Sequence, residues 1–148
     1  MGQNLGAGEP KRAEKSGWVA IGILEALMAA CSLAILFWAE NIIGIFTNEP
    51  DLMLLGGAFL RIATVSYLMM AIVFVLQYAL AGAGDTLPTM LISIGMLWVV
   101  QLPLAFLLPQ TTDLGIFGVR WAMVIGAFVG AVLFIVYFMR GRWKTRKV

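Results

Sequence analysis

The sequence predicts an all-α integral membrane protein with four transmembrane helices. Apolar residues make up 61% of its 148 residues and charged residues only 12%, against about 45–50% and 25% in soluble domains. The apolar residues form four runs, and a helix needs about 20 such residues to cross a bilayer core of about 30 Å. Backbone groups in hydrocarbon must be hydrogen-bonded within the structure that spans it, so the runs are expected to be helices.

The four runs and the segments that flank them divide the chain. We expect a head at 1–16, spans at 17–46, 52–80, 88–108 and 115–139, and a basic tail at 140–148. Short polar turns separate the spans, and none of them has room for a soluble domain. TNEPD joins the first two spans, with Pro50 suited to a first helical turn. PQTTDLG joins the last two.

The turn between the second and third spans reads AGAGDTLP. Gly82 and Gly84 suit the left-handed conformation that often ends a helix. Asp85 or Thr86 suits the capping position of the next helix, with Pro88 in its first turn.

Basic residues gather at the two ends of the chain. The head carries Lys11, Arg12 and Lys15, the tail carries five more, and the loops at 47–51 and 109–114 carry none. With four spans the head and tail lie on one side, and the positive-inside rule predicts that this side is the cytoplasm. Trp18 and Trp143 stand beside the basic clusters, where interfacial aromatic residues are expected. The basic tail either fixes this orientation or binds anionic lipid.

Two charges lie deep inside the spans. Glu25 is in the first span and Arg61 in the second, at similar predicted depths. An ionisable group at such depth costs several kcal/mol unless it is paired or hydrated. One interpretation places one or both of them on a water-filled path. The other makes them a structural ion pair, or lets Arg61 extend towards the outer interface.

The second span also carries a mixed stripe. Ser66, Met70, Phe74 and Gln77 recur at near-helical spacing and fall on one face. Polar, thioether and aromatic groups together suit a pocket for varied apolar cations, because methionine adapts its shape and aromatic rings attract cations. The alternative is ordinary helix packing with polar contacts between helices.

The remaining spans contain packing and bending signals. Pro103 removes a backbone hydrogen bond inside the third span, so a kink is expected there. Gly126 and Gly130 are four residues apart, as in close-packed membrane helices. Cys31 is expected to be a buried packing residue.

No residue pattern supports an enzyme. The chain has no histidine and one cysteine, so it offers no zinc set and no serine–histidine pair. Neither Gly6-Ala-Gly8 nor Gly82-Ala-Gly84 extends into a dinucleotide fingerprint. We therefore expect no cofactor, no metal and no catalytic residue. A net charge of +2 gives no reason to expect nucleic acid as a partner.

Four segments, in order, resemble the MATE (multidrug and toxic-compound extrusion) transporters. GQNLGAGEPKRAEKS is similar to the end of a helix and the cytoplasmic loop after it. FTNEPDLMLLGGAFLRI resembles an outer loop and helix start, ALAGAGDTLPTM a cytoplasmic turn, and VVQLPLAFLL a proline-bearing helix. The residues that carry the motifs are Gly2, Gln3, Gly6, Gly8, Gly82, Gly84, Asp85, Thr86, Pro88 and Pro103.

This resemblance implies a place in a larger assembly. MATE proteins usually have twelve helices in two lobes around a substrate cavity, and these four would be the last four. The missing N-terminal helices would then be partners, together with membrane lipid. The implied activity is efflux of small organic cations at the plasma membrane, by alternating access and in exchange for protons or sodium. The four helices alone are not expected to transport.

The resemblance assigns the stripe of the second span to the cavity wall, with departures. Met70 stands where some relatives carry a cation-binding carboxylate, which argues against a sodium site in this lobe. Ala81 stands where the turn usually has arginine. Two alternatives remain. One is a flippase of lipid-linked sugars, which would need more cationic residues than Arg61. The other is a small membrane protein that assembles with partner helices without transporting.

Overall fold

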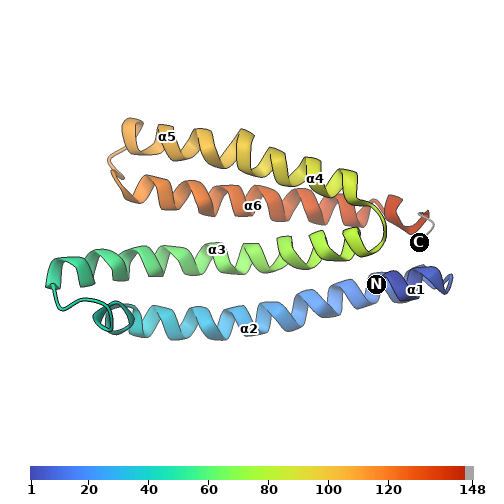
Figure 1. The fold of residues 1–148 in the computed structure, drawn as a ribbon, viewed down its shortest axis with the longest axis horizontal. Coiled ribbons are helices and arrows are strands. Elements are labelled where there is room, and N and C mark those ends of the chain that lie inside the picture. Colours follow the sequence, from blue (N-terminus) through green and yellow to red (C-terminus); the bar gives the residue numbers. More distant parts are fainter. Residues whose placement is uncertain (146–148) are drawn as a thin grey trace.

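The computed structural model describes residues 1–145, and every regular element in that part is a helix (Figure 1). Four segments are long and apolar enough to cross a membrane, which confirms the predicted fold class. They are α2, α3, the run of α4, η1 and α5, and α6. The elements are α1 Gly2–Gly6, α2 Pro10–Gly44, α3 Pro50–Gly82, α4 Thr86–Ile94, the π-helix η1 Gly95–Gln101, α5 Leu102–Thr111, α6 Phe117–Met139 and the 3-10 helix η2 Arg142–Thr145.

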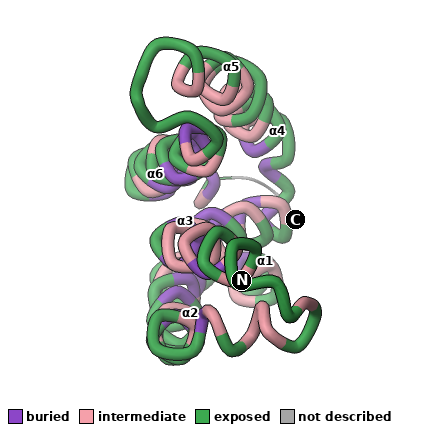
Figure 2. The backbone as a smooth tube through the Cα atoms, turned by 90° about the vertical axis from the view of Figure 1, so that its left-hand side faces the viewer, coloured by how far each residue is buried: buried purple, intermediate pink, exposed green. Residues whose placement is uncertain are grey.

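The spanning segments lie side by side in a row (Figures 1 and 2). α3 packs between α2 and α6, and α6 packs in turn against η1 and α5. The N-terminus, η2 and the α3–α4 turn lie at the same ends of the roughly parallel helices, and we call this end of the bundle the terminal end. The other two turns lie at the opposite, loop end. The two ends of the described chain are thus on one side, as the even number of spans predicts.

The second half of the head differs from the prediction. Residues 10–16, expected to be a loop, form the first two turns of α2. Pro10 occupies the first turn, where its missing N–H costs nothing, and residues with good helix propensity follow it. Residues Gly2–Gly6 form the short helix α1, which Asn4 ties to α2 by donating from Nδ2 to Ser16 Oγ at 3.1 Å.

The turn between α3 and α4 has different hydrogen bonds from those expected. Gly84 takes the left-handed conformation, with φ at +75°, whereas Gly82 is still helical. Asp85 occupies the capping position of α4, but its side chain makes no capping bond. Instead Tyr137 donates its hydroxyl to Asp85 Oδ2 at 2.6 Å. The buried carboxylate therefore ties this turn to α6.

The third spanning segment begins as predicted and is irregular in its middle. Thr86 and Pro88 lie in the first turn of α4. The irregularity expected at Pro103 precedes it, as the π-helical segment η1. Pro103 then lies in the first turn of α5. Both a π-helical turn and a proline interrupt the regular backbone ladder, so the interruption covers several residues.

Glycines let α6 pack closely against this irregular segment. Gly126 faces the side chain of Gln101, where an added methyl group would lie 3.0 Å from Cβ. Gly130 faces the Met96 side chain, which leaves no room for a methyl group. The predicted close packing at Gly126 and Gly130 is confirmed.

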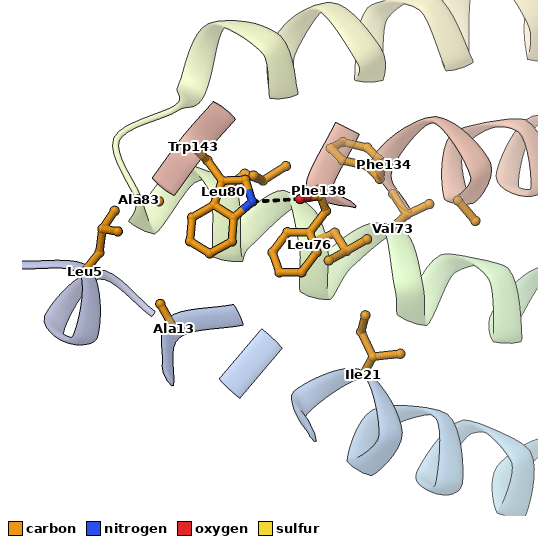
Figure 3. Packing of buried hydrophobic residues seen from close by; sticks show 11 residues of the cluster. Leu5, Ala13, Ile21, Val73, Leu76, Leu80, Ala83, Phe134, Phe138 and Trp143 are labelled. Carbon is orange, nitrogen blue, oxygen red and sulfur yellow. Dashed lines mark hydrogen bonds between the residues drawn. The ribbon is translucent and has the colours of Figure 1, made fainter. Parts of the chain in front are cut away.

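A buried apolar cluster occupies the terminal end (Figure 3). Trp143 stacks on Phe138 with ring centroids 5.0 Å apart and donates from Nε1 to the Phe138 carbonyl at 2.9 Å. The prediction of Trp143 as an interfacial residue is wrong, because Gly141, with φ at +71°, turns the chain back over the cluster. The cluster contains Leu5, Ala13, Ile21, Val73, Leu76, Leu80, Ala83, Ala131, Phe134, Phe138 and Trp143.

Burial is concentrated in the middle of the row. Buried residues lie mainly on α3 and α6, whereas η1 and α5 contain none (Figure 2). Large apolar side chains such as Phe37, Phe46, Trp98 and Phe106 are exposed. Cys31 is exposed too, so its predicted burial is wrong. Because the residues of η1 and α5 pack on one side only, lipid or further helices must cover their other face.

We predict that Gly118→Ala lowers the free energy of unfolding by about 1–3 kcal/mol, the usual cost of overpacking. A methyl group at Gly118 would lie 2.8 Å from the backbone nitrogen of Pro109, and backbone cannot rotate away. Gly22→Ala is the matched control, since nothing lies within 4 Å of that position. The measurement is a denaturant titration of the purified protein in detergent, followed by tryptophan fluorescence. Equal effects of the two substitutions would contradict the packing described.

Candidate functional site

A pocket of about 610 Å³ lies between α1, α2 and α3 near the terminal end. α2 contributes small residues to its wall and α3 contributes two aromatic rings. Among the described residues of the wall, only Ser16 and Tyr78 have polar groups in their side chains, so the surface suits an apolar or aromatic ligand. The residues that line it are Met1, Gly2, Ser16, Gly17, Ala20, Leu24, Phe74, Val75, Tyr78, Ala79 and Gly82.

Only one member of the predicted stripe lines this pocket. Phe74 does so, with 45% of its surface exposed. Ser66 is buried and donates its hydroxyl to the Ala63 carbonyl at 2.7 Å, so its polar group serves its own helix. Met70 packs against the apolar cluster, and Gln77 is half-buried outside the pocket wall. The structure therefore does not gather the four side chains around one ligand position.

The contribution of α2 to the pocket was not predicted from the sequence. Gly17, Ala20 and Leu24 recur at spacings of three and four, which places them on one helix face towards α3. The pattern that could have indicated this wall is the pair of small residues, Gly17 and Ala20, opposite Phe74 and Tyr78. Small residues leave space beside large rings.

Arg61 is paired, but with a different acid from the one considered. Its Nη1 lies 3.0 Å from Glu40 Oε1, and its Nε donates to the Leu36 carbonyl at 3.5 Å. Both charged side chains are only partly exposed, at 41% and 42%. The ion pair joins α2 to α3 towards the loop end.

The register of α2 and α3 explains why Glu25 is not the partner. Leu36 and Glu40 lie opposite Arg61 in the antiparallel pair. Glu25 is eleven residues before Leu36 in the sequence, or about 16 Å along the helix axis. The comparable depths predicted for Glu25 and Arg61 were wrong, because Arg61 lies opposite Leu36 and Glu40 in the antiparallel pair.

Glu25 itself has an unusual environment within the described part of the chain. Its Oε1 is buried, and residues 1–145 offer it no hydrogen-bond partner. A buried carboxylate oxygen without a partner is costly in an apolar surrounding. Glu25 therefore remains a candidate for a polar path, next in sequence to the pocket residue Leu24.

The terminal end carries a second ion pair. Lys144 Nζ lies 2.7 Å from Glu14 Oε2, so η2 is tied to the first turns of α2. Arg140 and Arg142 are exposed. Arg146 and Lys147 of the predicted basic tail lie outside the described residues. In the described part of the chain, no group of three histidine, cysteine, aspartate or glutamate residues is placed to hold a metal ion.

Known proteins resemble this chain over most of its length. It is 27% identical over 134 residues to "Probable multidrug resistance protein NorM" of Thermotoga maritima, covering 90% of this chain and 28% of the relative. It is 30% identical over 144 residues to the protein of that name from Rhodopseudomonas palustris, covering 95% and 30%. It is 28% identical over 144 residues to human "Multidrug and toxin extrusion protein 1", covering 97% and 25%.

The chain is much shorter than these relatives. It spans between a quarter and a third of the length of these relatives. No solved structure matches it. The family model described as MatE matches residues 1–107, which include α1, α2, α3, α4, η1 and the first residues of α5. The chain is a membrane protein of the MATE family.

Proposed function

We propose that the chain forms the last four helices of a two-lobed multidrug exporter. In this proposal the exporter moves small organic cations out of the cell by alternating access, in exchange for protons or sodium. The observation that carries the proposal is the family match over residues 1–107, in a chain that spans a quarter to a third of relatives named for multidrug resistance or extrusion. The relatives' names favour transport over catalysis.

The exposed surfaces support a place beside further helices. η1 and α5 bury no residue, and α2 keeps several large apolar side chains exposed. The pocket between α1, α2 and α3 is lined in part by the first residues of the chain, Met1 and Gly2. In the proposed exporter, the missing N-terminal helices close this pocket and complete the cavity. Both termini then lie on the cytoplasmic side of the plasma membrane, since the basic residues lie at that end.

Phe74 and Tyr78 are the groups that we assign to cation recognition. Both rings line the pocket, and an aromatic face attracts a cation that has lost part of its hydration. Gln77 lies on the same helix, one turn after Phe74, and in the complete exporter faces the cavity. Glu25 is the acid that we assign to the ion pathway of this lobe, because its buried oxygen lacks a partner within residues 1–145.

The ion pair of Arg61 weakens the flippase alternative. A cavity for a lipid-linked sugar phosphate needs free cationic side chains to neutralise the phosphate charge. Arg61 is the one cation in α3, and Glu40 at 3.0 Å already neutralises it. None of the residues in 1–145 that line the pocket is basic. The site therefore favours cations over anionic lipid-linked sugars.

The export proposal predicts that Phe74→Ala and Gln77→Ala slow the efflux of cationic dyes. The chain would be joined behind the N-terminal helices of a full-length relative and expressed in cells that lack their own exporters. We expect about a tenfold slower efflux for Phe74→Ala, since loss of a cation–ring contact of roughly 1–2 kcal/mol corresponds to about tenfold in affinity.

Phe106→Ala is the matched control for this experiment, because Phe106 is an exposed ring on α5 outside the pocket. It should leave efflux unchanged, and the 148-residue chain expressed alone should show no efflux. Unchanged export of several dyes by the Phe74→Ala protein would refute the assignment of this wall. Export by the chain alone would refute the need for the missing helices.

The ion pair gives a separate prediction about stability. Glu40→Gln should lower the free energy of unfolding by up to about 3 kcal/mol, the cost of an arginine left unpaired among apolar groups. The double variant Glu40→Gln/Arg61→Gln should recover most of this loss, because it removes both charges. Glu49→Gln, an exposed acid in the first turn between spans, is the control. Denaturant titration in detergent measures these three variants, the single variant Arg61→Gln and the unaltered protein, and strictly additive losses from the two single substitutions would contradict the pairing.

A further inference from the structure

A second groove, of about 510 Å³, follows the outer face of α2 at the terminal end. The part of the groove nearer the start of α2 is polar, with Asn4, Arg12 and Lys15. The part further along α2 is apolar, with Val19 and Ile23. The groove therefore changes from charged to apolar along a single helix.

The spacing of these residues makes the groove continuous. Arg12, Lys15, Val19 and Ile23 are three or four residues apart, so they lie on one face of α2. From Arg12 to Ile23 the helix rises about 16 Å, roughly half the thickness of a bilayer core. Val19 is 51% exposed and Ile23 68% exposed, so the apolar part is open along its length.

The charges at the polar part are available to a ligand. Arg12 and Lys15 form no ion pair with any residue of the described part of the chain. Lys15 also lines a neighbouring groove of about 530 Å³ with Lys11, so a third positive charge lies close by. Glu14, the acid in that neighbouring groove, is held by Lys144 at 2.7 Å. The net charge facing the polar part is thus positive.

The groove lies at the level expected for the boundary between lipid headgroups and acyl chains. Trp18, which borders the neighbouring groove, is 40% exposed, as is typical of aromatic side chains at the boundary between headgroups and acyl chains. The groove residues before Trp18 are charged or polar, and those after it are apolar. A ligand that fills the whole groove therefore needs an anionic head and an apolar tail.

We propose that this groove binds one anionic phospholipid from the leaflet at the terminal end. The phosphate lies between Arg12 and Lys15, with the amide of Asn4 beside it, and an acyl chain lies along Val19 and Ile23. A free phosphate would use only the polar half and leave the apolar half uncovered, which favours the lipid. This site adjoins the pocket assigned to transport, since Ser16 and Ala20 line both, but lipid binding there does not depend on the proposed export.

Native mass spectrometry of the protein purified in a neutral detergent tests the proposal. Phosphatidylglycerol and phosphatidylcholine would be added in turn at equal concentration. We expect one molecule of phosphatidylglycerol to stay bound at least about tenfold more tightly than phosphatidylcholine, since each basic contact near a membrane surface contributes appreciably. Arg12→Gln/Lys15→Gln should abolish this preference. Arg140→Gln/Arg142→Gln, which removes two exposed charges at the same end, should keep it.

Three results would overturn the proposal. One is equal binding of the two lipids by the unaltered protein, which needs no variant and so does not depend on variant folding. Another is equal loss of preference in both double variants, which would mean that overall charge and not the groove selects the lipid. The third is displacement of phosphatidylglycerol by soluble glycerol phosphate, which would mean that the site recognises a free phosphate. Circular dichroism checks that each variant keeps its helix content.

Discussion

The need to satisfy every backbone hydrogen bond without water governs this structure. In hydrocarbon an unpaired N–H or C=O costs several kcal/mol, so the apolar runs have no alternative to helices. The helices then have little hydrophobic reason to associate, and close contact must come from small residues and a few polar links. Gly126 and Gly130 provide that contact between α6 and η1, while Glu40 with Arg61 links α2 to α3. Lys144 with Glu14 closes the terminal end.

The fold follows from the sequence because composition and turn chemistry are local signals. Four apolar runs predicted four spans, and an even number of spans predicted that both termini share one end, which Figure 1 shows. Helix ends were less predictable. Pro10 starts α2 well before the apolar run, so the run marks the membrane and not the helix. Trp143 could not be placed, because its burial depends on a backward turn at Gly141.

The site was only partly predictable because side-chain partners depend on register. The stripe on α3 was visible, yet Ser66 bonds to its own helix and Met70 packs into the apolar cluster, which leaves Phe74 in the pocket wall. The partner of Arg61 depended on the register between α2 and α3, which the sequence left open. The lipid groove combines charges expected only to fix orientation with apolar residues expected only to span the membrane. A lipid site is indicated only because the charged and the apolar residues lie on one face of α2.

The central claim is that these helices form one part of a larger exporter. The most direct test is to add a tag to the C-terminus at the native locus and to measure the mass of the tagged protein in isolated membranes. The account predicts a protein of roughly three to four times 16.1 kDa, because the chain covers 28% and 30% of two relatives. A tagged protein of about 16.1 kDa alone would contradict it.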